Sequence, residues 1–197
     1  MILKSLTKPI LTLILCLSLS TVYGQHAMQI EGLLDAELNT ITIKQRIDYH
    51  NTSENHLSEL YFNDWTSSYS SPTTPLANRF VEEFNNALLD VKPKDRGFTT
   101  ITKIQDSAGK NMEFSYLENH PDIFKVTLKD EVLPHTSITL YFNYTIQIQN
   151  DRFTGYGVTN EGDFNLKYWY ISPAVYENSK WKLFSNKNTQ DYYTPQS

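Results

Sequence analysis

The sequence has almost no cysteine. Cys16 is the only one among the 197 residues, and it lies within the apolar run at residues 10–19. No disulfide can therefore form within the rest of the chain, and thiol nucleophiles and cysteine-based metal sites are excluded there. A domain without disulfides must depend on its hydrophobic core, and 13 Tyr, 10 Phe and 3 Trp supply the side chains for one.

The sequence also lacks the motifs of common catalytic machinery. It contains no HExxH string, which would place two zinc-binding histidines one helical turn apart, and no G-x-S-x-G nucleophile elbow. With seven glycines in all, the chain has no glycine-rich phosphate loop. His50 and His56 flank a short turn without a third ligand nearby in sequence. We therefore expect no enzyme activity, no catalytic residue, no metal site and no cofactor in this chain.

Positive charge is scarce. Lys and Arg number 17 against 22 Asp and Glu, giving a formal net charge of −5. A nucleic-acid-binding domain is expected to carry a basic patch, and no basic cluster is visible here. We expect no nucleic-acid partner and no binding to membrane surfaces through basic residues.

The first two dozen residues have the layout of a secretory signal peptide. Lys4 and Lys8 precede the apolar run at 10–19, which is too short to span a bilayer as a helix. Small or modest residues follow at 22–24. The sequence predicts a signal peptide at residues 1–24, export to the periplasm or beyond, and no membrane contact other than the signal peptide. Residues 25–197 are enough for one domain.

Apolar and polar residues alternate through most of the chain. The alternation is typical of half-buried β-strands and recurs at residues 40–49, 98–104, 123–128, 137–148 and 164–171. Residues 106–110, between two such runs, have the composition of a hairpin connection. Short turns between many strands favour a mainly β fold, an antiparallel, saddle-like β-sandwich.

One segment has helical periodicity instead. Residues 75–89 place apolar side chains on one side and polar ones on the other. Thr74 is a suitable N-cap, and Pro75 suits the first helical position. We expect a single amphipathic helix over about 75–89, packed on the sheet.

The C-terminal third is rich in aromatic residues. Strand alternation predicts that Tyr168 and Tyr170 share one face and Trp169 the other. With Trp181, these rings are candidates for core or domain-interface packing. Outward, coplanar rings would instead make a sugar-stacking platform, so a free-standing secreted binding module, with glycans as one ligand class, is the alternative function.

Eight separated blocks follow one another in the order seen in a known family. They are LDAE at 34–37, YHNT at 49–52, LYFNDW at 60–65, TPLANRF at 74–80, DRG at 95–97, DRFTGYG at 151–157, NLKYWYISPAVY at 165–176 and KWKLFSN at 180–186. Together they resemble the N-terminal domain of secreted bacterial zinc metallopeptidases of the M1 (gluzincin, aminopeptidase N-like) family. The resemblance covers about residues 28–195.

The resemblance implies a β-rich domain that packs on a thermolysin-like catalytic domain and helps close its active-site cleft. The zinc and its ligands belong to that catalytic domain, which this sequence does not contain, so a catalytic domain or chain is the expected partner. The family uses a Glu or Gln just before a proline to anchor the substrate amine. Here that position holds Ser172, followed by Pro173, and a neutral hydroxyl cannot offer the charge of a carboxylate.

Overall fold

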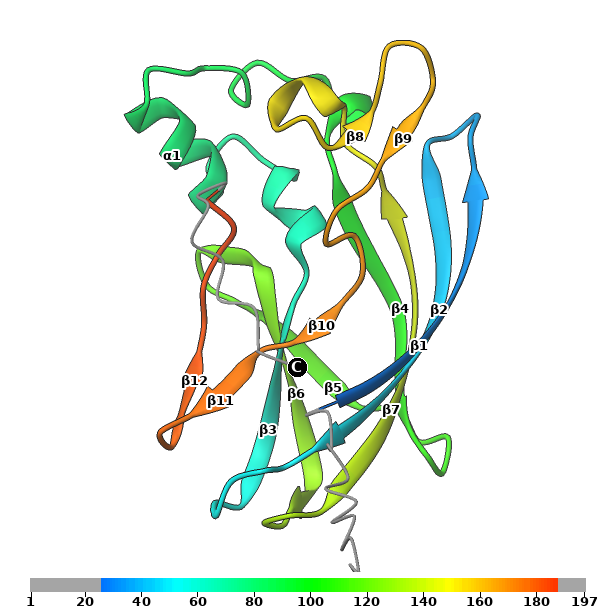
Figure 1. Ribbon diagram of the computed structural model, residues 1–197, viewed down its shortest axis with the longest axis vertical. Coiled ribbons are helices and arrows are strands. Elements are labelled where there is room, and N and C mark those ends of the chain that lie inside the picture. Colours follow the sequence, from blue (N-terminus) through cyan, green and yellow to red (C-terminus); the bar gives the residue numbers. More distant parts are fainter. Residues whose placement is uncertain (1–25, 188–197) are drawn as a thin grey trace, which may run out of the picture.

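The computed structural model describes residues 26–187, and the predicted signal peptide at 1–24 lies outside them. Two four-stranded antiparallel sheets dominate the fold (Figure 1). The first contains, in spatial order, β1 (His26–Asp35), β2 (Thr40–His50), β7 (Ser137–Gln147) and β4 (Phe98–Asp106). The second contains β10 (Ser172–Pro173), β3 (Leu57–Asn63), β6 (His120–Val132) and β5 (Glu113–Leu117). The predicted mainly β, antiparallel fold with one α-helix is confirmed.

Shorter elements cover the edges and one end of the two sheets. The two small hairpins are β8 (Gly157–Val158) with β9 (Phe164–Asn165), and β11 (Val175–Glu177) with β12 (Lys180–Lys182). The helical elements are η1 (Trp65–Tyr69), α1 (Pro75–Glu82), η2 (Pro93–Asp95) and η3 (Asp151–Phe153). All four helical elements gather at the upper end of the molecule in Figure 1.

The main core fills the space between the two sheets. In β2 every second side chain from Ile41 to Tyr49 is buried, which is the alternation that the sequence predicts. Aromatic rings join the sheets at the centre: the Phe62 ring lies 5.4 Å from that of Phe124 and 5.2 Å from that of Phe142. Apolar burial of this kind is the main source of stability in a domain without disulfides.

The helix is shorter than expected. It begins at Pro75, with the Thr74 hydroxyl accepting a hydrogen bond from the Ala77 amide, but it ends at Glu82 rather than near residue 89. The Asn85 amide bonds to the Phe80 carbonyl and the Phe84 amide to the Val81 carbonyl, which is a Schellman motif. Phe84 takes the left-handed conformation of that motif, with φ of 60°, and its side chain is 98% exposed. The helical periodicity beyond residue 82 therefore arises from a turn.

The strand expected over residues 164–171 is also interrupted. Only Phe164–Asn165 and, further on, Ser172–Pro173 pair in sheets. Tyr168 has a φ of 51°, so the chain reverses its side-chain alternation there. The prediction that Tyr168 and Tyr170 share a strand face was wrong, because tertiary packing of the rings overrides the strand propensity of the sequence.

The segment at 106–110 is a turn, but it does not join paired strands. The Asp106 carboxylate accepts amide hydrogen bonds from Ala108 and Lys110, and Gly109 has a φ of 79°. Apart from a single bridge between Gln105 and Asn111, β4 and β5 belong to different sheets. The turn therefore carries the chain from one layer of the sandwich to the other.

A second, smaller core lies beneath the helix. Its buried side chains are Tyr69, Leu76, Ala77, Phe80, Leu88, Val91 and Phe153. The buried guanidinium of Arg96 donates hydrogen bonds to the carbonyl oxygens of Tyr69, Leu88 and Leu89. We call residues 64–97 together with 150–158 the helical cap, because they close this end of the sandwich.

Candidate functional site

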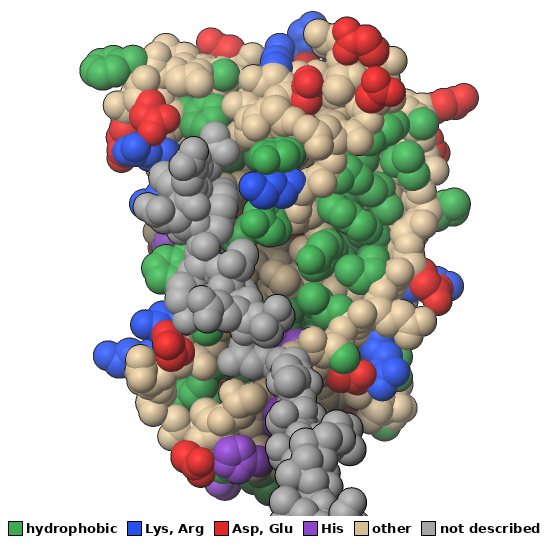
Figure 2. Space-filling model, in the orientation of Figure 1, with side chains coloured by type: hydrophobic (Ala, Val, Ile, Leu, Met, Phe, Trp, Pro, Cys, Tyr) green, Lys and Arg blue, Asp and Glu red, His purple; other side chains and the backbone are tan. Residues whose placement is uncertain are grey.

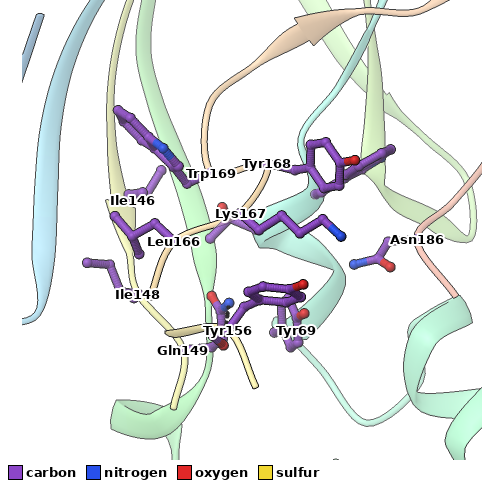
Figure 3. A pocket seen from close by; sticks show the side chains of 12 residues that line it. Tyr69, Ile146, Ile148, Gln149, Tyr156, Leu166, Lys167, Tyr168, Trp169 and Asn186 are labelled. Carbon is purple, nitrogen blue, oxygen red and sulfur yellow. Dashed lines mark hydrogen bonds between the residues drawn. The ribbon is translucent and has the colours of Figure 1, made fainter. Parts of the chain in front are cut away.

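A small pocket opens where the helical cap meets the sandwich (Figure 3). We call it the end pocket, and its volume is about 40 Å³. Its lining residues are Trp65, Thr66, Tyr69, Ile146, Ile148, Gln149, Tyr156, Leu166, Lys167, Tyr168, Trp169 and Asn186. They come from η1, the end of β7, the loop before β8, the segment 166–169 and the chain after β12. A pocket of this size holds a small group and not a whole peptide.

Glycines set the position of Tyr156 in this pocket. Gly157 has a φ of 136°, and a Cβ there would lie 2.1 Å from the carbonyl oxygen of Gln149. The backbone of β8 therefore lies directly against Gln149, where the Val158 amide bonds to the Gln149 carbonyl at 2.8 Å. The Gln149 side chain donates a hydrogen bond to the Tyr156 carbonyl. Only glycine at 157 permits this approach.

A lysine lies between two of the pocket's aromatic rings. The Lys167 Nζ atom is 5.0 Å from the ring centroids of both Tyr156 and Tyr168. Trp65 packs edge-to-face on Tyr168, with ring centroids 4.4 Å apart. In Figure 3 the Lys167 side chain runs between the Tyr168 ring and the Tyr156 ring, and its amine points toward Asn186.

Two buried carboxylates lie beneath η1. Hydroxyl groups donate to the Asp64 carboxylate from Ser67 (2.7 Å), Thr99 (2.5 Å) and Tyr116 (2.9 Å). The Asp122 carboxylate accepts from the Ser185 hydroxyl (2.8 Å) and the Asn186 amide (2.6 Å). Burial raises the pKa of both carboxyl groups, and these hydrogen bonds offset part of the increase. Asp122 thus holds the chain at 185–186, and Asn186 lines the end pocket.

A buried hydrogen-bond network holds the segment before β10 against the first sheet. The Gln45 amide donates to the Ile171 carbonyl at 2.7 Å, and the Tyr144 hydroxyl donates to the Gln45 side-chain oxygen at 2.5 Å. The Ile171 amide in turn donates to the Tyr144 oxygen at 3.2 Å. Every polar atom of this group inside the core has a partner, so its burial is tolerated.

Beside this segment, apolar side chains of the edge strand β1 reach the surface. The β1–β2 register pairs Met28 with Ile47 and Leu34 with Ile41, so both belong to the core-facing side of β1. They are nevertheless 41% and 45% exposed. A Cβ at Gly32 would lie 3.8 Å from the Trp169 ring, which places that ring on the same face.

We call this surface the β1 strip, and its members are Met28, Ile30, Leu34, Phe164, Leu166 and Trp169. Figure 2 shows hydrophobic side chains gathered over this side of the molecule. Met28 and Leu34 are its exposed members, and the other four are partly buried against the main core. Exposed apolar side chains next to such a cluster are candidates for packing against another protein surface.

The residues predicted as a site lie in three different places in the structure. Tyr168 lines the end pocket, and the Tyr170 ring contacts Trp169 at 5.7 Å. Trp181 lies in another cluster, with ring centroids 5.0 Å from Tyr176 and 5.3 Å from Tyr61. Ser172 and Pro173 lie on β10, paired with Asn63 and Phe62. Pro173 is buried and Ser172 is half-buried.

The rings do not form a flat platform. Trp169 and Tyr170 meet at 89°, Trp65 and Tyr168 at 84°, and Tyr176 and Trp181 at 61°. Sugar stacking requires coplanar outward faces, so these angles argue against a glycan-binding surface.

Within residues 26–187, no group of three or more His, Cys, Asp or Glu side chains has the arrangement of a metal site. The two histidines that flank the turn at residues 51–55 have different partners: His50 bonds to Ser137, and His56 bonds to Glu131. No helix in the described part of the chain is long and apolar enough to cross a membrane.

Comparison of the sequence with models of protein families finds no match, and comparison with curated proteins finds none either.

Sequence reasoning missed several residues of the end pocket. Lys167 and Tyr156 were not candidates, because a lysine next to an aromatic run and a tyrosine between two glycines have no distinctive spacing. The available signal was Gly155-Tyr156-Gly157, whose second glycine marks the close backbone approach that aims the tyrosine into the pocket.

Proposed function

We propose that this chain is a non-catalytic β domain that packs on the catalytic domain of an exported M1-type zinc peptidase and helps close its active-site cleft. The observation that carries the proposal is the β1 strip. Met28 and Leu34 lie on the core-facing side of β1 but are exposed to solvent. Another protein could bury these apolar side chains by packing against them. The ordered sequence blocks that resemble the M1 N-terminal domain are the reason for proposing this class of partner.

Part of the β1 strip lies within the sequence blocks that resemble the M1 family. Trp169 and Leu166 lie within the longest of these blocks, at residues 165–176, and both belong to the β1 strip. The segment is held in place from below by the bond between Gln45 and Ile171. This bond ties the segment that carries Leu166 and Trp169 to the first sheet, and a segment that is already ordered has a lower entropic cost of docking.

The active site would lie in the partner, which supplies the zinc, its ligands and the general base. Ser172 is the residue of this chain that corresponds to the family's amine-anchoring acid, and it is half-buried on β10. Because its hydroxyl is neutral, the assembled peptidase would bind a substrate's free amine less strongly than relatives with a carboxylate do.

The first step of the test is to read the DNA adjoining the coding region and to express the zinc peptidase domain that we expect it to encode. Binding of this chain to that domain is then measured by isothermal titration calorimetry. Leu34→Asp should weaken binding at least tenfold, because it places a charge in the apolar interface. Leu33→Asp is the matched control, since Leu33 is 75% exposed on the opposite side of the same strand.

Equal affinity of the two variants would contradict docking through the β1 strip. The absence of an adjoining zinc peptidase domain would contradict the choice of partner. Hydrolysis of aminoacyl-arylamides by the purified chain alone, lost on adding a chelator, would contradict its non-catalytic role.

A further inference from the structure

The end pocket has the composition of a cation-binding aromatic cage. Tyr69 and Trp65 come from η1, Tyr156 from the loop before β8, and Tyr168 from the segment after β9. Four separate rings from three parts of the chain thus converge on one small space. The faces of tyrosine and tryptophan rings carry negative electrostatic potential, so a space that they surround attracts a cation.

A cation of the chain itself already occupies the cage. The Lys167 ammonium lies 5.0 Å from the ring centroids of Tyr156 and Tyr168, within the range in which a cation is attracted to a ring. Lys167 is nevertheless an exposed residue with a long, flexible stem. Displacement of its amine by another cation would involve rotation about these side-chain bonds.

The ring of Tyr168 is held in position at a conformational cost. Tyr168 has a left-handed backbone, with a φ of 51°, which a bulky residue adopts rarely. Such conformations persist where the surroundings impose them, and they concentrate at functional sites. Here the contact with Trp65 at 4.4 Å keeps the ring over the pocket.

The lining selects the kind of cation. Among the described residues that line the end pocket there is no Asp or Glu, so the aromatic and apolar side chains dominate this lining. Ile146, Ile148 and Leu166 form an apolar wall beside the rings (Figure 3). A methylated ammonium carries its charge under apolar methyl groups and is the ligand that an aromatic cage with apolar walls fits best.

We propose that the end pocket binds a methylated ammonium group and that Lys167 is the internal occupant which this ligand displaces. Leu166 and Trp169 belong both to the lining of the end pocket and to the β1 strip. The proposal is nevertheless tested independently of the proposed packing partner, because cation binding is measured on the purified chain alone.

Tetramethylammonium and choline are the probes, titrated into the purified chain and followed by isothermal titration calorimetry. Lys167→Met removes the internal competitor but retains an apolar stem. We expect this variant to bind either probe at least tenfold more tightly than the wild type does. Lys103→Met, which removes the same charge from an exposed lysine of β4, should bind as the wild type does.

Two further measurements separate cation binding from simple apolar binding. The neutral isostere of choline, 3,3-dimethyl-1-butanol, should bind Lys167→Met at least tenfold more weakly than choline does. Replacing Tyr168 by Leu in the Lys167→Met background should reduce choline affinity by a similar factor. Circular dichroism melting of each variant verifies that it is folded. The proposal is overturned if Lys167→Met binds neither probe at millimolar concentration, or if the neutral isostere binds equally well.

Discussion

The sandwich and the helical cap each contain a buried core, but different interactions hold them together. Between the sheets, strands with a period of two bring one apolar side chain after another into the core, and rings such as Phe62 and Phe142 join the layers. In the cap, a few specific residues hold the chain in place. Arg96 donates hydrogen bonds to three carbonyls, and Asp64 accepts hydrogen bonds from three hydroxyls. Gly157, which has no side chain, lets the backbone of β8 lie against the Gln149 carbonyl.

The sandwich should therefore tolerate substitutions better than the cap, whereas the cap positions its side chains more narrowly. A core made of many similar apolar contacts accepts changes of shape if its volume is retained. A region held by single hydrogen bonds and close backbone approaches cannot repack, but it fixes the rings of the end pocket at defined positions. The four predictions below measure this contrast, beginning with the largest expected effect.

Phe62→Ala should destabilise the whole protein by about 3–5 kcal/mol, because it leaves a cavity between the sheets where the Phe62 ring contacts two others. The free energy of unfolding is measured by urea denaturation followed by circular dichroism. Phe84→Ala is the control, since Phe84 is 98% exposed, and it should change that free energy by less than about 0.5 kcal/mol. Equal losses for the two variants would show that the sheets are not joined as described.

Gly157→Ala should cost about 2–3 kcal/mol, because its Cβ would lie 2.1 Å from the Gln149 oxygen and φ is 136°. Gly155→Ala is a matched control two residues away, with φ of 76° and open space around it, and should cost about 1 kcal/mol. Urea denaturation gives both values. If the two substitutions cost the same, the close approach at Gly157 does not support the cap.

The buried carboxylates should make the protein lose stability as the pH rises. In the folded state the pKa of Asp122 is above its ordinary value of 3.8, so between these two values the folded chain binds more protons than the unfolded chain. The free energy of unfolding therefore falls as the pH increases through that window. The fall is limited, because hydrogen bonds from Ser185 and Asn186 stabilise the carboxylate.

Asp122→Asn should flatten this pH dependence, measured by urea denaturation at intervals from pH 4 to pH 8. Its amide retains an acceptor for the Asn186 backbone and does not titrate. Asp130→Asn, at an exposed position, should leave the profile as in the wild type. A profile of Asp122→Asn that matches the wild type would mean that the buried group does not govern the pH response.

Thr74→Ala should have the smallest effect, about 1 kcal/mol, because it removes the hydrogen bond from the Ala77 amide at the start of α1. Amide hydrogen exchange should show the loss in α1 and not in β2 or β7. The exposed neighbour Thr73 serves as the control, and Thr73→Ala should leave exchange in α1 unchanged. Faster exchange in β2 would indicate that cap and sandwich open as a single unit.

The sequence predicts the sandwich well because its strands follow one rule. Residues 40–49 alternate apolar and polar side chains, and β2 covers them with one more residue. The same holds for β7, whose run was expected at 137–148 and ends at Gln147. Where burial on one face decides the structure, the pattern of single residues is sufficient.

The cap and the end pocket were harder to predict because contacts distant in sequence decide them. Nothing local marks Phe84 as the residue that ends the helix, since a glycine would be usual there. The bend at Tyr168 depends on its contact with Trp65, about a hundred positions earlier in the chain. Tyr168 was predicted as a residue of core or domain-interface packing and not of a pocket, and Lys167 and Tyr156 become visible only when the rings are brought together.

The bond between Gln45 and Ile171 also has a consequence for the order of folding. It joins residues 126 positions apart, and Tyr144 connects to both. Closing so long a loop is slow, since its entropy must be lost before the contact forms. Strands β1, β2 and β7 can pair before Ile171 reaches its place against them. Tyr144 of β7 can then already donate to the Gln45 oxygen, but the Gln45 amide lacks its Ile171 acceptor until the segment before β10 is in place, so that segment completes the domain.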